Sequence, residues 1–282
     1  MKIQDLETKQ TNTWCLGCLN NGILLATKQA LVNLVNQKQV KRKNIVGVCG
    51  IGCGAKIYDY LEINSFYSLH GRVLPTCLGI KTANPNLTVL GFAGDGGTYA
   101  EGMSHLIHII RHNPNLTMIV YNNQVFALTT GQATPTTEKG FRTPAAPSGA
   151  RDNPLNPIAI TLAAGATFVA RASSLDVAGL TQIIESAIKH QGFSFIDVLQ
   201  PCLSFHNDIT YLQNHSYKLE EKGKKRDDYF WAMKKAKEWN YDREDNAKIP
   251  LGIFYQIREK TWEEKWPQLK KPWYKVKRNT QK

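Results

Sequence analysis

A glycine-rich motif, Gly94-Asp-Gly-Gly97, directly follows an apolar run that is typical of a buried strand. Glycines at such a turn let the main chain approach a phosphate, with free N–H groups facing the ligand. Asn122 and Asn123 follow the next apolar run, 28 positions after Asp95, which leaves room for one helix and one strand. Parallel strands end at a shared edge, so a carboxylate and an amide oxygen can meet there as ligands of Mg²⁺. Together the motifs predict a diphosphate and magnesium site, although each alone is also typical of an ordinary turn.

The cysteines form a second group of residues that could do chemistry. Six cysteines are too few for a disulfide scaffold in a chain of 282 residues. Cys15 and Cys18 have the Cys-x-x-Cys spacing of a zinc site, of a dithiol redox pair, or of two ligands of an iron–sulfur cluster. Spacing alone does not choose among the three. Of the other cysteines, Cys53 in a glycine-rich turn and Cys202 after an apolar run are further candidate ligands, whereas Cys49 and Cys77 are expected in the core.

The segments that must position these residues alternate between two hydrophobic patterns. Helices are predicted over residues 21–37, 75–83, 99–112, 157–165 and 174–190, and strands over 44–48, 87–92, 116–121, 167–172 and 194–200. A glycine-rich turn, residues 49–54, follows the first of these strands. This alternation is typical of βαβ units, so the prediction is an α/β fold with a mostly parallel sheet and helices on both faces.

Two segments lack the hydrophobic periodicity of a helix or a strand. Residues 124–156 are rich in Thr, Pro and Gly, and a loop of that length inside a compact domain is usually functional or disordered. Because it begins directly after Asn123, we favour function. From residue 203 onward the pattern weakens into a charged extension that contains five tryptophans. We therefore predict a first domain over 1–202 and a C-terminal extension over 203–282 that packs on this domain or on a partner subunit.

The formal net charge is +12, and the excess of Lys and Arg lies in residues 38–43, 222–226, 234–237 and 270–282. Such runs are usually solvated faces, and attraction for an acidic electron carrier is the next interpretation. Nucleic acid is an unlikely partner. The N-terminal residues are polar, and no apolar run approaches the length of a membrane span. A cytoplasmic protein without membrane contact is the expectation.

Seven motifs, in this order and spacing, resemble those of the β subunit of 2-oxoacid:ferredoxin oxidoreductases. They are Trp14-Cys-Leu-Gly-Cys18, Gly50-Ile-Gly-Cys-Gly54, His70-Gly-Arg72, Gly79-Ile-Lys81, Gly94-Asp-Gly96, Asn122-Asn123 and the segment Thr130 to Thr137. The resemblance covers residues 14–202 and implies a thiamine-diphosphate-binding fold. Leu16, Leu19 and Gly97 depart from the residues usual in this family, which leaves the substrate branch open.

The resemblance also implies roles for particular residues. The thiolates of Cys15, Cys18, Cys53 and Cys202 would bind a [4Fe–4S] cluster. Asp95, Asn123 and the carbonyl of Val125 would bind Mg²⁺. Thiamine diphosphate would contact Ile51, Gly52, Cys53, Gly54, His70, Gly94, Gly96, Gly97, Asn123, Ala127 and Leu128. His70 would bind the cofactor or handle a proton, and Lys56 would face the substrate carboxylate or coenzyme A, although either could also be an ordinary exposed residue.

The activity that the resemblance implies is coenzyme A-dependent oxidative decarboxylation of a 2-oxoacid. Thiamine diphosphate supplies a nucleophilic carbon and an electron sink, and the cluster passes electrons singly to ferredoxin. A separate α subunit, or an α/γ pair, would carry the pyrimidine domain, giving a heterodimer or larger assembly. Pyruvate, 2-oxoglutarate, branched-chain oxoacids and indolepyruvate all remain open as substrates. The alternatives are a thiamine enzyme without electron transfer and a non-catalytic zinc- or nucleic-acid-binding protein.

Overall fold

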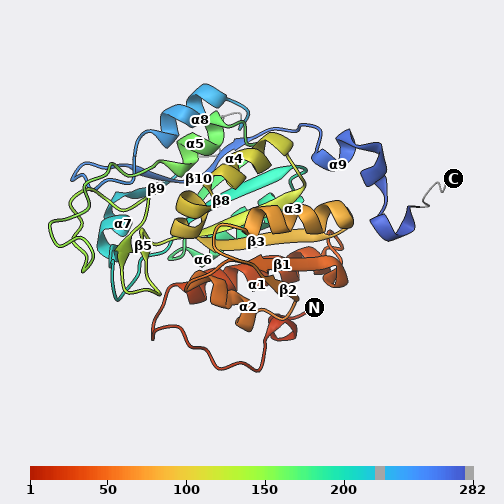
Figure 1. The fold of residues 1–282 in the computed structure, drawn as a ribbon, viewed down its shortest axis with the longest axis horizontal. Coiled ribbons are helices and arrows are strands. Elements are labelled where there is room, and N and C mark those ends of the chain that lie inside the picture. Colours follow the sequence, from red (N-terminus) through yellow and green to blue (C-terminus); the bar gives the residue numbers. More distant parts are fainter. Residues whose placement is uncertain (220–225, 277–282) are drawn as a thin grey trace.

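A single large β-sheet runs through the molecule in the computed structural model, which describes residues 1–219 and 226–276 (Figure 1). Its strands lie in the order β2-β1-β3-β4-β8-β7-β10-β9. Those from β2 to β7 in this order are parallel, whereas β10 runs antiparallel to β7 and parallel to β9. The strands are β1 Ile45–Cys49, β2 Asn64–Tyr67, β3 Thr88–Gly94, β4 Leu116–Asn122, β7 Phe168–Ser173, β8 Phe193–Leu199, β9 Ser216–Lys218 and β10 Ile249–Gln256. The predicted α/β fold with a mostly parallel sheet is confirmed.

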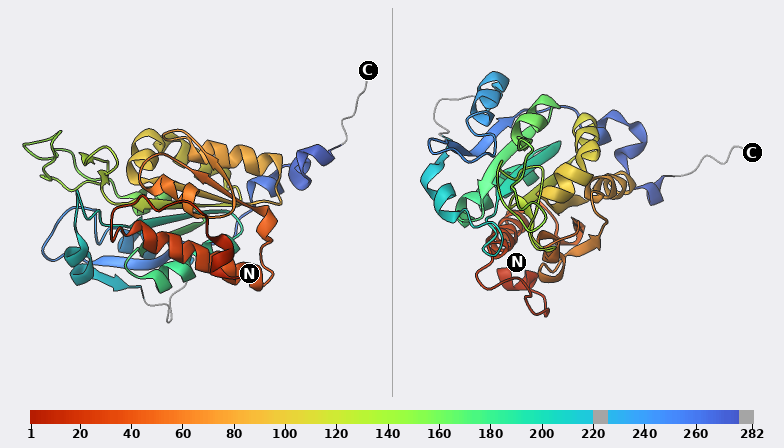
Figure 2. Two further views of the ribbon diagram at one scale, coloured as in Figure 1. Left: turned by 90° about the horizontal axis from the view of Figure 1, so that it is seen from below. Right: turned by 60° about the vertical axis from the view of Figure 1, so that its left-hand side comes forward.

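Helices cover both faces of this sheet (Figure 2). On one face α1 packs against α6, and on the other α3, α4, α5 and α8 cover a second core. The helices are α1 Asn20–Asn36, α2 Ile57–Tyr60, α3 Val73–Ala83, α4 Met103–His112, α5 Pro157–Ala163, α6 Val177–Lys189, α7 Ile209–His215, α8 Tyr229–Ala236 and α9 Trp262–Lys265. Because both faces are covered, the central strands β4 and β8 are buried at every residue, which explains their continuous apolar runs.

The structure differs from the predicted elements at two places near the site. The helix expected over 99–112 begins earlier, with the π-helical segment Gly96–Glu101, before α4. In this wide turn the hydroxyl of Thr98 donates to the carbonyl of Gly94 at 2.8 Å, and such segments are frequent at functional sites. Strand β2 was not predicted, because most of its residues are exposed at the edge of the sheet and carry no apolar run. The long segment 124–156 contains only the short hairpin β5 Val125–Phe126 and β6 Gln132–Ala133.

The chain after residue 202 adds β9 and β10 to the same sheet. Trp239 stacks on Tyr241 with ring centroids 4.3 Å apart, and the guanidinium of the buried Arg171 on β7 lies over both rings. The extension thus packs on the domain, and a domain boundary at 202 stays a prediction. Residues 222–225 and 277–282 of the predicted basic runs lie outside the described residues. Among the described helices, none has the length and apolar character needed to cross a membrane.

His190, directly after α6, is a buried titratable group of this fold. Its Nε2 lies 2.9 Å from the hydroxyl of Thr167, and its ring packs against Phe168. Burial, together with the charge of Arg258, lowers the pKa of His190 to about 4. The native chain therefore binds a proton at this site less tightly than the unfolded chain does.

We expect the free energy of unfolding to fall as the pH drops from about 6.5, the pKa of histidine in an unfolded chain, towards 4. The shift corresponds to a loss of roughly 3 kcal/mol below the folded pKa of about 4, since one pKa unit is 1.36 kcal/mol. Urea unfolding over this pH range should show the loss in the wild type and not in His190→Gln. A pH profile in His190→Gln that matches the wild type would contradict the prediction.

Candidate functional site

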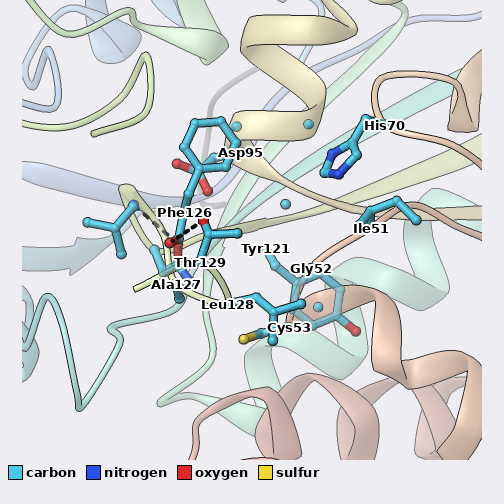
Figure 3. Close-up of a pocket in the computed structure, with 16 residues that line it drawn as sticks. Ile51, Gly52, Cys53, His70, Asp95, Tyr121, Phe126, Ala127, Leu128 and Thr129 are labelled. Atoms are coloured by element: carbon cyan, nitrogen blue, oxygen red, sulfur yellow. Dashed lines mark hydrogen bonds between the residues drawn. The ribbon is translucent and has the colours of Figure 1, made fainter. Parts of the chain in front are cut away.

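The loops after β1, β3 and β4 meet because these strands are neighbours and end at one edge of the sheet. The structure places every residue that was expected to contact the cofactor in the wall of a single cavity (Figure 3), namely Ile51, Gly52, Cys53, Gly54, His70, Gly94, Gly96, Gly97, Asn123, Ala127 and Leu128. Asp95 and Val125, the other expected magnesium ligands, line the same cavity. Residues from four separate loops thus converge at the carboxyl edge.

Two glycines leave room for aromatic rings that form this wall. A Cβ atom on Gly54 would lie 2.8 Å from the ring of Tyr121, and one on Gly96 would lie 2.2 Å from the ring of Phe126. Real Cβ atoms do not approach rings so closely, so both positions require glycine. Gly96 lies at the start of the π-helical segment, and its main chain forms part of the cavity wall beside the ring of Phe126.

Asp95 is the acidic group of this cavity and is only 2% exposed. Its Oδ2 accepts hydrogen bonds from the hydroxyls of Thr134 at 2.5 Å and Thr136 at 2.9 Å. Burial raises the pKa of Asp95 to about 6, and the two hydroxyls oppose this shift. With the amide of Asn123 and the carbonyl of Val125 in the same wall, the available donors are hard oxygens, which fit Mg²⁺.

A second cavity, of about 280 Å³, is lined by Cys15, Cys18, Cys53 and Cys202. The four thiols are free and come from the N-terminal loop, the turn after β1 and the loop after β8. Burial raises the pKa of Cys18 to about 11, and the other three cysteines add to this shift because they lie close by. Four sulfur atoms around one cavity form a ligand set that fits an iron–sulfur cluster or zinc.

The remaining two cysteines, Cys49 and Cys77, are 1% and 0% exposed in the two hydrophobic cores. Neither lines the cofactor or the cysteine cavity. Their prediction as core residues is confirmed.

The two cavities share part of their walls. Cys53, Asn123, Ala127 and Leu128 line both, so only the width of these residues separates the cavities. Trp14 fixes the N-terminal loop here, since its Nε1 donates to the carbonyl of Cys53 at 2.7 Å. The four cysteines thus lie directly beside the cavity that contains Asp95.

Comparisons with known proteins agree with this arrangement. Residues 50–198 match the family model of the thiamine pyrophosphate enzyme C-terminal TPP binding domain, and residues 202–271 match that of the C-terminal region of the pyruvate ferredoxin oxidoreductase β chain. The chain is 42% identical over 260 residues to the 2-oxoacid:ferredoxin oxidoreductase subunit β of Saccharolobus solfataricus, covering 87% of this chain and 82% of the relative. The chain belongs to the family of 2-oxoacid:ferredoxin oxidoreductase β subunits. It is thereby a subunit of an oxidoreductase, and the resemblance drawn from the sequence is confirmed.

Two further relatives extend the likeness along nearly the whole β subunit. The 2-oxoacid:ferredoxin oxidoreductase 1 subunit β of Aeropyrum pernix is 36% identical over 293 residues, covering 97% of this chain and 87% of the relative. A solved structure of the 2-oxoglutarate:ferredoxin oxidoreductase from Magnetococcus marinus, with 2-oxoglutarate, coenzyme A and succinyl-CoA bound, matches with a TM-score of 0.87 at 27% identity. It covers 94% of this β subunit and 88% of that chain.

The two residues with expected catalytic roles lie at different places in this β subunit. His70 lines the cofactor cavity (Figure 3), with its side chain 58% exposed and its Nδ1 3.9 Å from Oε1 of Glu101. Lys56 lines the cysteine cavity instead, and its Nζ donates to the carbonyl and the hydroxyl of Thr13 at 3.2 and 3.1 Å. A substrate role for Lys56 stays a prediction.

Sequence reasoning missed three residues that line the cofactor cavity, Tyr121, Phe126 and Thr129 (Figure 3). The position of Tyr121, directly before Asn122 at the end of a strand, was a signal that could have found it. Thr134 and Thr136 fell inside a recognised motif, but nothing local indicated that they donate to Asp95.

A buried ion-paired group beside Cys202 was also missed. Nε2 of His206 lies 2.7 Å from Oε2 of Glu138, and its Nδ1 lies 3.2 Å from Oδ2 of Asp208. Burial alone would lower the pKa of His206, but the hydrogen bond and charge of Glu138 raise it above its ordinary value. His206 and Cys202 also exchange two main-chain hydrogen bonds of 2.9 Å. The group therefore ties the segment that carries Cys202 to the long loop 124–156.

Substitution of Gly96 by Ala should weaken thiamine diphosphate binding, because the new Cβ would displace the ring of Phe126. Overpacking of this kind typically costs about 1–3 kcal/mol, and the same cost taken from binding is roughly 5- to 150-fold in affinity. Calorimetric titration of the complex coexpressed with its partner, with Mg²⁺ present, measures the change. Gly79→Ala in α3 is the control, since nothing lies within 4 Å of its added Cβ, and its affinity should match the wild type. A folded Gly96→Ala complex with unchanged affinity would contradict the prediction.

Proposed function

We propose that this chain holds thiamine diphosphate, Mg²⁺ and a [4Fe–4S] cluster in a 2-oxoacid:ferredoxin oxidoreductase, and that the complex oxidatively decarboxylates a 2-oxoacid with coenzyme A. The observation that carries the proposal is the common wall of the two cavities, formed by Cys53, Asn123, Ala127 and Leu128. An enzyme that takes electrons from a bound cofactor needs an acceptor close to that cofactor. The four thiols lie where such an acceptor is needed.

In the cofactor cavity each group has a chemical task. When bound, thiamine diphosphate supplies the carbon that attacks the 2-oxoacid and the ring that takes up the electron pair. Asp95, Asn123 and Val125 would hold Mg²⁺ and, through it, the diphosphate, while Gly96 lets main-chain N–H groups approach the same anion. His70 lies in this wall with a half-exposed ring, so it can hold or release a proton there.

The cysteine set also fits zinc, which is the second candidate for this cavity. We favour the iron–sulfur cluster because a zinc ion has no redox chemistry and could not accept electrons from a cofactor in the adjacent cavity. Of the four ligands, Cys15 is exposed, so electrons can leave the chain on its side. Ferredoxin is the proposed acceptor there.

The cofactor cavity needs a partner to close it. Leu69, next to His70, is 72% exposed, and Leu128 in the cavity wall is 51% exposed. Exposed apolar side chains grouped at the mouth of a cavity fit a surface that a second subunit covers. We propose that this partner is the α subunit, or an α/γ pair, with the pyrimidine domain. The 2-oxoacid and coenzyme A found in the Magnetococcus marinus relative support the same substrate class here.

The test of the metal assignment is anaerobic purification of the chain coexpressed with its genomic neighbour, followed by iron, sulfide and zinc analysis. We expect a brown protein with about four iron atoms and four sulfides per chain, which bleaches when a 2-oxoacid and coenzyme A are added. Cys15→Ala should remove most of the iron and the visible absorption but retain thiamine diphosphate. Cys49→Ala, in the core outside both cavities, should retain both. A colourless wild type with bound zinc would remove the electron-transfer half of the proposal.

Turnover should depend on the partner subunit. Purified alone, the reconstituted chain should reduce ferredoxin or a dye at a rate near the background, because the second half of the cofactor site is missing. Adding the purified partner should restore activity in proportion to the complex formed, measured by size-exclusion chromatography and dye reduction. Full turnover by the single chain would contradict the partner assignment.

A further inference from the structure

One buried polar side chain in the wall of the cysteine cavity has no partner. Asn20 is 1% exposed, and among the described residues neither its Oδ1 nor its Nδ2 has a hydrogen-bond partner. Asn20 is one of the residues that line the cavity formed by the four cysteines. An unsatisfied buried amide is destabilising, so a group that occupies the cavity is the expected partner.

Asn20 already contacts one sulfur atom through its main chain. It is the first residue of α1, two positions after Cys18, and its main-chain N–H donates to the sulfur of Cys18. The nearby carbonyl of Cys18 is already taken by the main chain and the side chain of Asn21. Asn20 does not cap the helix either, since the N-cap is Leu19 and no capping bond to a side chain is present. The sulfur atoms of the four cysteines line the same cavity as Asn20, and Cys18 is only two positions away.

We propose that Asn20 donates a side-chain hydrogen bond to a sulfur of the [4Fe–4S] cluster and thereby raises the reduction potential of the cluster, an inference that rests on the proposed function. The one-electron reduction adds a negative charge that spreads over the sulfur atoms. An N–H donor stabilises this reduced form more than the oxidised form, and hydrogen bonds to sulfur are among the factors that set such potentials. The N-terminus of α1, with 17 residues, acts in the same direction because its dipole is positive at this end.

The reduction potential of the cluster tests the proposal in the complex copurified with its partner subunit, by an anaerobic redox titration followed by electron paramagnetic resonance. Asn20→Leu removes the donor, and Asn20→Asp keeps the shape but replaces the donor with an anionic acceptor. In both, the ratio of reduced to oxidised cluster at a fixed potential should fall roughly tenfold, which is about 59 mV for a one-electron couple.

Thr27→Val is the matched control. Thr27 lies in the same helix, is 0% exposed and also has a buried hydroxyl without a partner among the described residues, but it does not line the cysteine cavity. Removal of this polar atom should leave the potential at the wild-type value. A shift in both Asn20 variants and not in Thr27→Val is therefore specific to the cavity.

Each other outcome is decisive. If the Asn20 variants keep the wild-type potential, the proposal is overturned. If Asn20→Leu does not retain a cluster, Asn20→Asp decides by its potential, and loss of the cluster from both would overturn the tuning role and assign Asn20 to assembly. A wild-type complex without iron would instead overturn the proposed function, which separates the two failures.

Discussion

Asp197 lies at 0% exposure in β8 and accepts hydrogen bonds from three separate parts of the chain. Tyr99 of the π-helical segment donates at 2.5 Å, Tyr241 of the C-terminal extension at 2.6 Å, and Asn122 at the end of β4 at 3.0 Å. A buried carboxylate is tolerated only when donors surround it, so these groups cannot separate without a large cost. The carboxylate therefore fixes the end of β4, from which Asn123 and Val125 follow into the cofactor cavity.

From Asn122 the same network continues across the site. The Thr136 hydroxyl lies 2.9 Å both from Oδ1 of Asn122 and from Oδ2 of Asp95, and Gln124 donates to the main chain of Thr136 and of Tyr241. The long loop thus brings the neutral hydroxyls of Thr134 and Thr136 to the buried carboxylate of Asp95, which otherwise has the main chain of Gly96 as a donor. These hydrogen bonds hold residues 124–156 in place although the segment has no hydrophobic periodicity, and threonine hydroxyls supply several of them.

The adjacency of the two cavities depends on loops that are distant in the sequence. The turn after β1 supplies Cys53 to both cavities, because β1 lies beside β3, and the loop after β8 supplies Cys202. The pair of Glu138 and His206 holds this second loop against the first site. A relative with 27% identity keeps the backbone with a TM-score of 0.87, so this arrangement of elements tolerates extensive change of side chains.

The sequence alone determined the alternation of strands and helices and the glycine-rich turns, because apolar periodicity and glycine act locally. It also selected the four cysteines and Asp95, Asn123 and Val125 as candidate ligands, which stays a prediction. It did not determine that β9 and β10 join the sheet, that Lys56 faces the cysteine cavity, or that Cys53 and Asn123 line both cavities. Asp197 illustrates this difference. In the sequence it is one polar residue within an apolar strand, and only the structure shows that Tyr99 and Tyr241, 98 and 44 positions away, donate hydrogen bonds to it. Such contacts depend on the packing of the whole sheet, since no local pattern records which distant donor will satisfy a buried acceptor.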